Sequence, residues 1–313
     1  MRVTRIAVVM ALCAGAAAQL QAQTPIRTGD ITVRGLSAAD FPRVTKLAEN
    51  VYAYEQIDPT KRTVTANNLI VVTTDGVLIA EGQGTAANVT RLVADVAKIT
   101  PQPIKYVVIG SEHGDHTGGD AAFPATAIFI AHPFSQANLE RQAQNRRPNQ
   151  SKVVVPTETV DAKRTLMLGS TEIQILFLGR AHTGGDLEVY LPREKILFMS
   201  EVFLNRIFPS MANAYPTEWV ETLKRAEQMD VALFVPAHGF IDSATVLKEE
   251  ERNYRMALEQ ILAEGKRLHD AKVPIENATA GANFGVYDNW TRAANNAYAA
   301  LKRVYMELDG ELK

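Results

Sequence analysis

The stretch Gly110-Ser-Glu-His-Gly-Asp-His-Thr-Gly-Gly119 directly follows the apolar run Ile104–Ile109. Two other segments place a histidine beside glycine after strand-like runs, Gly179-Arg-Ala-His-Thr-Gly-Gly185 and Pro236-Ala-His-Gly239. Loops at strand ends are where functional sites concentrate. Glycine there allows sharp turns and close approach of a ligand. The pattern predicts that three segments far apart in the sequence build one site.

The sequence His-Thr-Gly-Gly-Asp occurs twice, at residues 116–120 and 182–186. The separation is too long for a solenoid unit. We interpret the two copies as strand-end loops of two similar half-domains that contribute to a shared site. Asp120 and Asp186 then either accept hydrogen bonds from histidines of the site or cap the next element.

The residue types in these loops are metal donors, namely His113, Asp115, His116, His182 and His238. Imidazoles and a carboxylate, without thiolate, suit zinc, with manganese and iron as alternatives. In an extended stretch, His113 and Asp115 project to the same side and His116 points elsewhere. One compact segment would therefore supply two adjacent metal positions.

This arrangement resembles the metallo-β-lactamase superfamily, whose first motif is His-x-His-x-Asp-His. Residues 111–116 read Ser-Glu-His-Gly-Asp-His, and His182 and the His238 of Pro-Ala-His-Gly are similar to the later histidines of the family. The resemblance covers roughly residues 45–242. It implies an α+β fold, an αββα sandwich of two mixed β-sheets covered by helices, with the site along one edge.

The resemblance also divides the ligands between two metal positions. His113 and His182 belong to the first position, and Asp115, His116 and His238 belong to the second. Each ion would be held at an edge of the sandwich, and the cofactor that the resemblance implies is zinc.

Two residues depart from the family pattern. Ser111 stands where a histidine is usual, and a neutral hydroxyl is a poor zinc ligand. We therefore expect one zinc bound tightly at the second position and another bound more weakly at the first. Glu201 stands where many hydrolases of the superfamily carry a bridging aspartate, so it is either a longer bridging carboxylate or a surface charge. Ser200 is the alternative neighbour of the site.

Apolar periodicity predicts alternating strands and helices, and hence mixed sheets covered by helices. Asn68–Ala80 has the pattern of a hairpin around Asp75-Gly76. Further strands are predicted at Ile104–Ile109, Ala127–Ala131, Glu172–Leu178, Leu187–Leu191, Lys195–Met199 and Ala232–Val235, and helices at Thr85–Lys98, Trp219–Gln228, Thr245–His269 and Trp290–Leu308. Trp290 and Tyr298 are spaced like one core-facing helix surface.

The N-terminus has the pattern of a secretory signal peptide. Arg2 and Arg5 precede the apolar run Ile6–Ala18, and Ala22 offers a small residue for cleavage. The run is shorter than the ~18 residues that indicate a membrane span. We therefore expect a periplasmic or secreted protein with no stable membrane anchor, an uncleaved anchor being the alternative. The only cysteine, Cys13, lies in this run, so the mature chain would have no disulfide.

We divide the chain into a signal peptide (1–22), a lead-in segment (23–44), a catalytic domain (45–242) and a helical C-terminal extension (243–313). The 313 residues are 46% hydrophobic and 22% charged, which is ordinary globular composition. The formal net charge of -2 provides no basic field for nucleic acid, so the expected partner is a small-molecule substrate.

The sequence offers no nucleophile for a covalent acyl-enzyme, since it has no Gly-x-Ser-x-Gly elbow and no cysteine outside the N-terminal run. We expect a metal-bound hydroxide to attack a carboxyl-type substrate, with Asp115 as metal ligand and catalytic hydrogen-bond acceptor. The leading substrate is a β-lactam, and a lactone, ester or thioester is the alternative. A non-catalytic metal- or ligand-binding protein with a decayed site is the alternative from another class.

Overall fold

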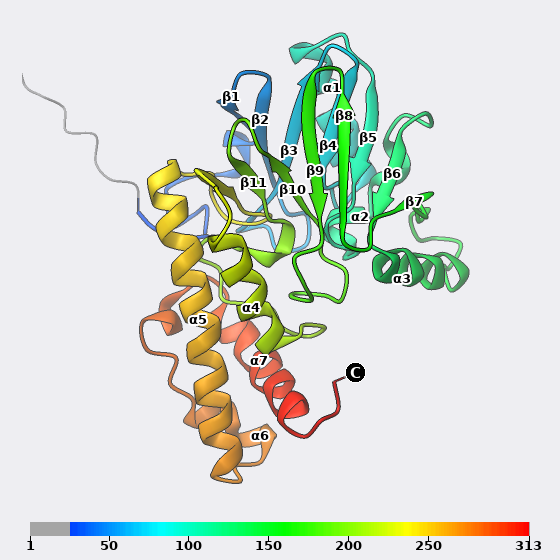
Figure 1. The fold of residues 1–313 in the computed structure, drawn as a ribbon. Helices are drawn as coiled ribbons and strands as arrows, with labels where there is room; N and C mark the ends of the chain where they lie inside the picture. The colour runs from blue at the N-terminus through cyan, green and yellow to red at the C-terminus, as the bar shows by residue number, and fades with distance from the viewer. Residues whose placement is uncertain (1–25, 313) are drawn as a thin grey trace, which may run out of the picture.

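Two β-sheets lie face to face in the computed structural model, which describes residues 26–312 (Figure 1). The first sheet has the order β1 (Arg43–Ala48), β2 (Val51–Ile57), β3 (Thr65–Thr73), β4 (Gly76–Ala80), β5 (Ile104–Val108), β6 (Ile128–Ala131), β7 (Glu158–Thr159). The second has the order β12 (Leu233–Val235), β11 (Ile196–Phe198), β10 (Glu188–Leu191), β9 (Thr171–Leu176), β8 (Lys163–Leu168). The signal-peptide prediction lies outside the described residues.

Helices cover the outer faces of both sheets. The helices are α1 (Ala86–Ile99), α2 (Gly114–Thr117), α3 (Pro133–Gln144), α4 (Pro216–Glu227), α5 (Ala244–Asp270), α6 (Ile275–Ala278) and α7 (Ala293–Leu308). Apolar residues of α1 and α3 share a core with the first sheet, and those of α4, α5 and α7 share the larger core with both sheets. The α+β sandwich expected from the sequence is therefore confirmed.

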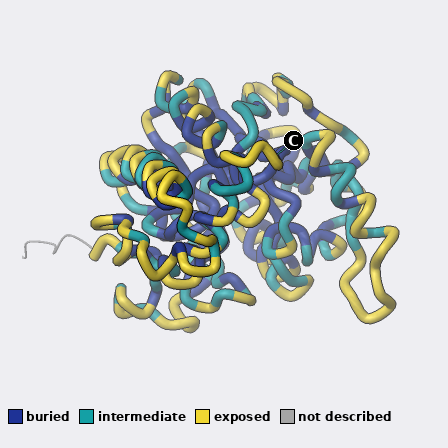
Figure 2. Tube along the Cα trace, turned by 90° about the horizontal axis from the view of Figure 1, so that it is seen from below, coloured by how far each residue is buried: buried dark blue, intermediate teal, exposed yellow. Residues whose placement is uncertain are grey.

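Alternate residues of the central strands point into two different cores. In β4, Leu78 belongs to the core between the sheets and Ile79 to the core under α1. In β5, Val108 and Val107 divide in the same way. Strands β4, β5 and β6 are parallel neighbours buried on both faces, which explains their nearly continuous apolar sequence. Figure 2 shows buried chain through the middle of the molecule and exposed chain at its periphery.

The strands and helices predicted from the sequence are present, with ends that differ by a few residues. The prediction missed β1, β2, β7, β8, α2, α3 and α6. Strand β1 is a half-exposed edge strand, and α3 buries only two residues, Ser135 and Leu139, so neither has a strong apolar pattern. Helix α7 begins at Ala293 rather than Trp290, and Tyr298 is 44% exposed. The expected core-facing pair of Trp290 and Tyr298 is therefore wrong, since only Trp290 is buried.

The C-terminal helices pack onto the sandwich. Residues of α5 and α7 belong to the core between the sheets, and α5 lies against β12 and α4. The chain just before α7 pairs with the loop that follows β11, because Phe208 donates its backbone N–H to the carbonyl of Thr291 at 2.9 Å. Within residues 26–312, no helix has the length and apolar character needed to cross a bilayer.

Helices α5 and α7 approach closely at Gly265. A Cβ atom at this position would lie 2.6 Å from Cγ1 of Val304 in α7. Overpacking costs ~1–3 kcal/mol, and alanine favours a helix over glycine by ~1 kcal/mol. We expect Gly265→Ala to lower the free energy of unfolding by ~1 kcal/mol in thermal or urea denaturation.

The matched experiment combines Gly265→Ala with Val304→Ala. The double variant should lose less free energy of unfolding than the two single variants lose when their losses are added. The reason is that removal of the valine methyl groups gives the added methyl group room. Greater stability of Gly265→Ala alone than of the unmodified protein would contradict the close approach.

Candidate metal centre

The segment that leads off β5 turns into helix α2 directly after His113. His113 has extended backbone angles and precedes the helix, whereas Asp115 and His116 lie within it. The prediction of an extended stretch is therefore wrong, because the two glycines at 118 and 119 pack the turn against residues 83–85. The helical turn sends His113 to one group of donors and sends Asp115 and His116 to another.

Two groups of donor atoms result, which we call cluster A and cluster B. Cluster A consists of His113, His182 and Glu201, and cluster B consists of Asp115, His116, His238 and Glu201. Within each cluster the donor atoms all lie within 4.8 Å of one another. The structure thus brings together the five residues proposed as ligands, in the same two groups, and adds Glu201 to both.

In cluster A, Glu201 lies beside both histidines. His113 Nδ1 lies 2.8 Å from Glu201 Oε2, and His182 Nε2 lies 3.2 Å from Glu201 Oε1. Ser111 is fully buried and donates its hydroxyl hydrogen to Glu201 Oε2 at 2.6 Å. Ser111 therefore holds the carboxylate in place and does not itself contact the two histidine rings.

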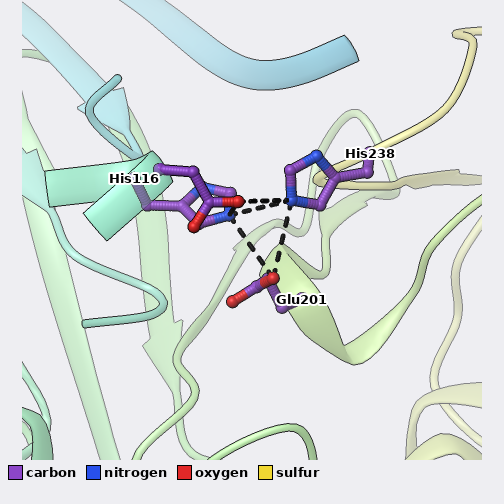
Figure 3. A group of neighbouring side chains, drawn as sticks. His116, Glu201 and His238 are labelled. Carbon is purple, nitrogen blue, oxygen red and sulfur yellow. Dashed lines mark hydrogen bonds and ion pairs between the residues drawn. The ribbon is translucent and has the colours of Figure 1, made fainter. Parts of the chain in front are cut away.

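In cluster B, Glu201 approaches from below the two histidines (Figure 3). His116 Nε2 and His238 Nε2 lie 3.1 Å apart, and Glu201 Oε1 lies 3.6 Å and 3.5 Å from them. Asp115 Oδ2 lies 3.4 Å from His238 Nε2. Glu201 is buried and comes from the turn after β11, so the alternative of an exposed strand-end charge is wrong.

The facing nitrogens test whether these residues fit a metal. His238 Nδ1 lies 2.6 Å from the carbonyl oxygen of Thr65 and donates a hydrogen to it, so in the neutral ring the lone pair is on Nε2, which faces His116. In cluster A, His113 Nδ1 and His182 Nε2 also face each other at 3.1 Å. Lone pairs and carboxylates that converge in this way fit a bound cation, and the nitrogen and oxygen donors fit zinc.

The carboxylates of the site are ionised, whereas its histidines differ in their pKa values. Burial raises the pKa of Glu201, but the neighbouring histidines outweigh burial and hold that pKa well below its usual range. For Asp115, burial is likewise outweighed by His116 and His238, and the pKa is lowered. Burial lowers the pKa of His182 to about 3. Burial lowers the pKa values of His113 and His116, but the carboxylates of Glu201 and Glu81 outweigh burial and raise them to about 9 and about 10. Zinc would therefore have to displace protons from these two rings when it binds.

Ser200 and Glu81 support the site from behind. Ser200 has a left-handed backbone, with φ 48°, and its hydroxyl donates to Glu81, not to either cluster. Glu81 is fully buried, and its Oε2 lies 3.7 Å from His116 Nδ1, the nitrogen on the far side of the ring from cluster B. The sequence interpretation missed Glu81, which has only the appearance of a charge after a strand.

The aspartates of the repeated sequence have different surroundings. Asp186 accepts the backbone N–H of Thr183 at 2.6 Å, which caps the turn after His182. Among residues 26–312, no hydrogen bond joins Asp120 or Asp186 to a histidine of either cluster. Asp186 therefore closes its own His-Thr-Gly-Gly turn, which is neither of the two roles expected from the sequence.

Lys61 is a second residue that the sequence did not reveal. It lies in the loop between β2 and β3, and its ammonium group contacts Asp115 Oδ2 and lies 3.0 Å from Asp58 Oδ2. Asp115 Oδ2 is also the oxygen nearest His238 in cluster B. A positive charge from the protein therefore competes with a metal for one ligand atom. A lysine in a loop normally indicates only a solvated surface.

A cavity of about 200 Å³ opens over both clusters. Its lining includes His113, Asp115, His182, Glu201 and His238. Its lining also includes Leu204, Ile207 and Ser210 of the loop after β11, and Arg292 and Asn296 at the start of α7. The site can therefore admit a small molecule that contacts both the donor atoms and the start of α7.

Comparisons with known proteins agree with this geometry. The family model described as the metallo-beta-lactamase superfamily matches residues 66–238, more than half of the chain. The 2,4-dinitroanisole O-demethylase subunit alpha of Nocardioides sp. (strain JS1661) is 24% identical over 140 residues, 44% of this chain and 41% of that subunit. The match thus spans well under half of the subunit's length. The metallo-beta-lactamase type 2 of Bacillus sp. (strain 170) is 22% identical over 210 residues, 65% of this chain and 79% of that protein.

Two solved structures share the fold. A metallo-beta-lactamase from Pontibacter korlensis has a TM-score of 0.59 and 21% identity, and the match covers 69% of this chain and 99% of that one. A double mutant of the sec-alkyl sulfatase PisA1 has a TM-score of 0.67 and 15% identity, and the match covers 85% of this chain and 50% of that one. At these identities the likeness establishes the fold alone.

The shared position of Glu201 gives a prediction on metal content. Glu201→Gln keeps the shape of the side chain but removes the charge that both clusters use. We expect zinc affinity at both clusters to fall by at least ~10- to 100-fold, as losses around a metal typically do. Competitive titration with a chelator measures both affinities. Glu55→Gln, a buried glutamate outside both clusters, is the control, and two equally tight zinc ions in Glu201→Gln would contradict the shared role.

The contact of Lys61 with Asp115 gives a second prediction. Unit charges 4 Å apart interact by about 4 kcal/mol at an effective dielectric constant of ~20. Lys61→Met should therefore tighten zinc binding at cluster B by at least ~10-fold, whereas Lys61→Arg, which keeps the charge, should leave it nearly unchanged. The same chelator titration decides, and weaker binding in Lys61→Met would show that the ammonium supports the metal instead of competing with it.

Proposed function

Because the chain belongs to the metallo-beta-lactamase superfamily, we propose that it is a zinc-dependent hydrolase acting on a small molecule. The observation that supports this best is the sharing of Glu201 between clusters A and B. Paired clusters joined by one carboxylate suit two ions a few ångströms apart, the arrangement used by many hydrolytic enzymes. Zinc bound there would supply a water-derived nucleophile near neutral pH and polarise a substrate carbonyl.

The side chains have separate roles in this proposal. His113, His182 and Glu201 hold one ion, and Asp115, His116 and Glu201, together with His238, hold the other. Cluster A has three donors and cluster B has four, so we keep the expectation of one tight zinc at cluster B and a weaker one at cluster A. Asp115 remains ionised, so one of its oxygens can accept a hydrogen from a nucleophilic water and fix its direction.

The leading substrate class is a β-lactam. Support comes from the similarity to a metallo-beta-lactamase type 2 over 65% of the chain, and from the N-terminal pattern, which we propose directs export to the periplasm or the medium, where β-lactams act. The cavity size suits a small ring.

An ester-type substrate is the second candidate. It is supported by the carboxylate at position 201 and by the sec-alkyl sulfatase, whose likeness covers 85% of the chain and so extends beyond the family match. Lactones, thioesters and sulfate esters fall in this class. A non-catalytic binding protein is the third candidate, and the completeness of both clusters argues against it.

A substrate panel distinguishes these functions. The purified protein should open a chromogenic cephalosporin, lose the activity after chelation and regain it with added zinc, because water activation needs the metal. His238→Ala, which removes a donor from cluster B, should lose most of the activity. The control is His269→Ala, since His269 contacts Asp309 on the outside of the molecule.

The other outcomes are equally informative. Turnover of nitrophenyl esters, lactones or a nitrophenyl sulfate without β-lactam turnover would establish the second candidate. Tight binding of two zinc ions without hydrolysis of any member of the panel would favour the non-catalytic protein.

A further inference from the structure

Arg292 lines the cavity over the two clusters. It is the residue just before α7, and it lines the same cavity as Asp115, Glu201 and His238. Its backbone is left-handed, with φ 66° and ψ 14°. Left-handed non-glycine residues are uncommon and cost free energy, and they persist where the surrounding structure holds them in place.

The backbone around Arg292 is held by the loop that follows Glu201. Phe208 donates its N–H to Thr291 at 2.9 Å, and Thr291 donates its own N–H to Arg206 at 3.2 Å. Asn296, one turn into α7, donates its side-chain amide to the carbonyl of Phe208 at 2.7 Å. These bonds fix the start of α7 against the loop after β11, so the backbone of Arg292 is held in place beside the cavity.

The guanidinium of Arg292 has no carboxylate within 4.0 Å and no side-chain hydrogen bond among residues 26–312. Its neighbour Arg206 differs, because it forms an ion pair with Glu250 at 2.5 Å. Lys61, the other cation of the cavity, is occupied by Asp115 and Asp58. Arg292 therefore offers the cavity a half-buried, permanently positive group whose donors are free to bind.

We infer that Arg292 binds a carboxylate of the substrate, so that the preferred substrates are anions whose scissile bond lies a short distance from that carboxylate. The inference rests on the proposed hydrolase function. A guanidinium binds a carboxylate through two parallel hydrogen bonds, which fixes orientation as well as position. Because Arg292 and the donor atoms line one cavity of about 200 Å³, a single small molecule can reach both.

The apolar side chains of the cavity fit this view. Val64, Leu204 and Ile207 line the same cavity as the donor atoms and Arg292. They can contact the carbon chain or ring that joins the two polar ends of the substrate. Arg292 also lies outside residues 66–238, so the subsite comes from a part of the chain that the family match does not include.

The test compares matched charged and neutral substrates. One pair is the nitrophenyl monoester of glutarate and nitrophenyl pentanoate, and another is a chromogenic cephalosporin and its methyl ester. The zinc-loaded protein should prefer the charged member of a pair. Arg292→Gln should lower kcat/KM for the charged member by ~10- to 100-fold, mainly through KM, because hydrogen bonds to charged groups have that worth. Turnover of the neutral member should change by less than about threefold.

Two further variants keep the result interpretable. Arg292→Asn replaces the arginine with a residue that tolerates a left-handed backbone, so a similar loss there shows that folding is not the cause. Arg62→Gln is the matched control, because Arg62 is an exposed arginine with φ 51° that does not line the cavity. Its kinetics should equal those of the unmodified protein.

A binding experiment separates this inference from the hydrolase proposal. Calorimetry should show glutarate binding to the zinc-loaded protein and at least ~10-fold weaker binding to Arg292→Gln. If no substrate is hydrolysed but this difference appears, the carboxylate subsite stands and the hydrolase proposal fails. Equal glutarate affinity in both proteins, or an equal loss for charged and neutral substrates, would overturn the subsite.

Discussion

The buried carboxylate of Glu201 is the constraint on which the rest of the site depends. An isolated buried carboxylate is costly, and burial alone would raise its pKa. It remains ionised because histidines from three separate segments surround it and Ser111 donates a hydrogen bond to it. These segments follow β5, β9 and β12, and Glu201 itself follows β11. Both sheets must therefore end at one edge, in register, for this charge to be accommodated.

The sequence predicted more of the site than of its surroundings. The five proposed donors are adjacent to glycines in strand-end loops, and this local chemistry is readable without a structure. Their predicted division into two groups also agrees with clusters A and B, although the backbone conformation that produces it is not the expected one. An extended segment was expected, whereas a single turn of helix after His113 separates the side chains. Short helical turns of this kind depend on contacts with a distant loop, here residues 83–85, which a local pattern does not contain.

The residues that the sequence missed share one property. Lys61, Glu81 and Arg292 are ordinary charged residues in loops or at strand and helix ends, with no repeat or motif around them. Their importance arises from where the chain brings them, and each reaches the site through tertiary contacts far apart in sequence. The fold could be predicted because the local sequence of a strand shows how far it is buried. Strands such as β4 and β5 are buried on both faces, and their composition records that burial directly.

The pairing of Thr291 with the loop at 206–208 joins two parts of the chain that are separate in sequence. The donor atoms of both clusters come from residues 113–238, whereas part of the cavity lining comes from the start of α7. Substitutions in the C-terminal helices can therefore reshape part of the cavity while every donor atom remains in place. Such a division lets selection, natural or in the laboratory, vary which molecules enter without rebuilding the centre that they meet.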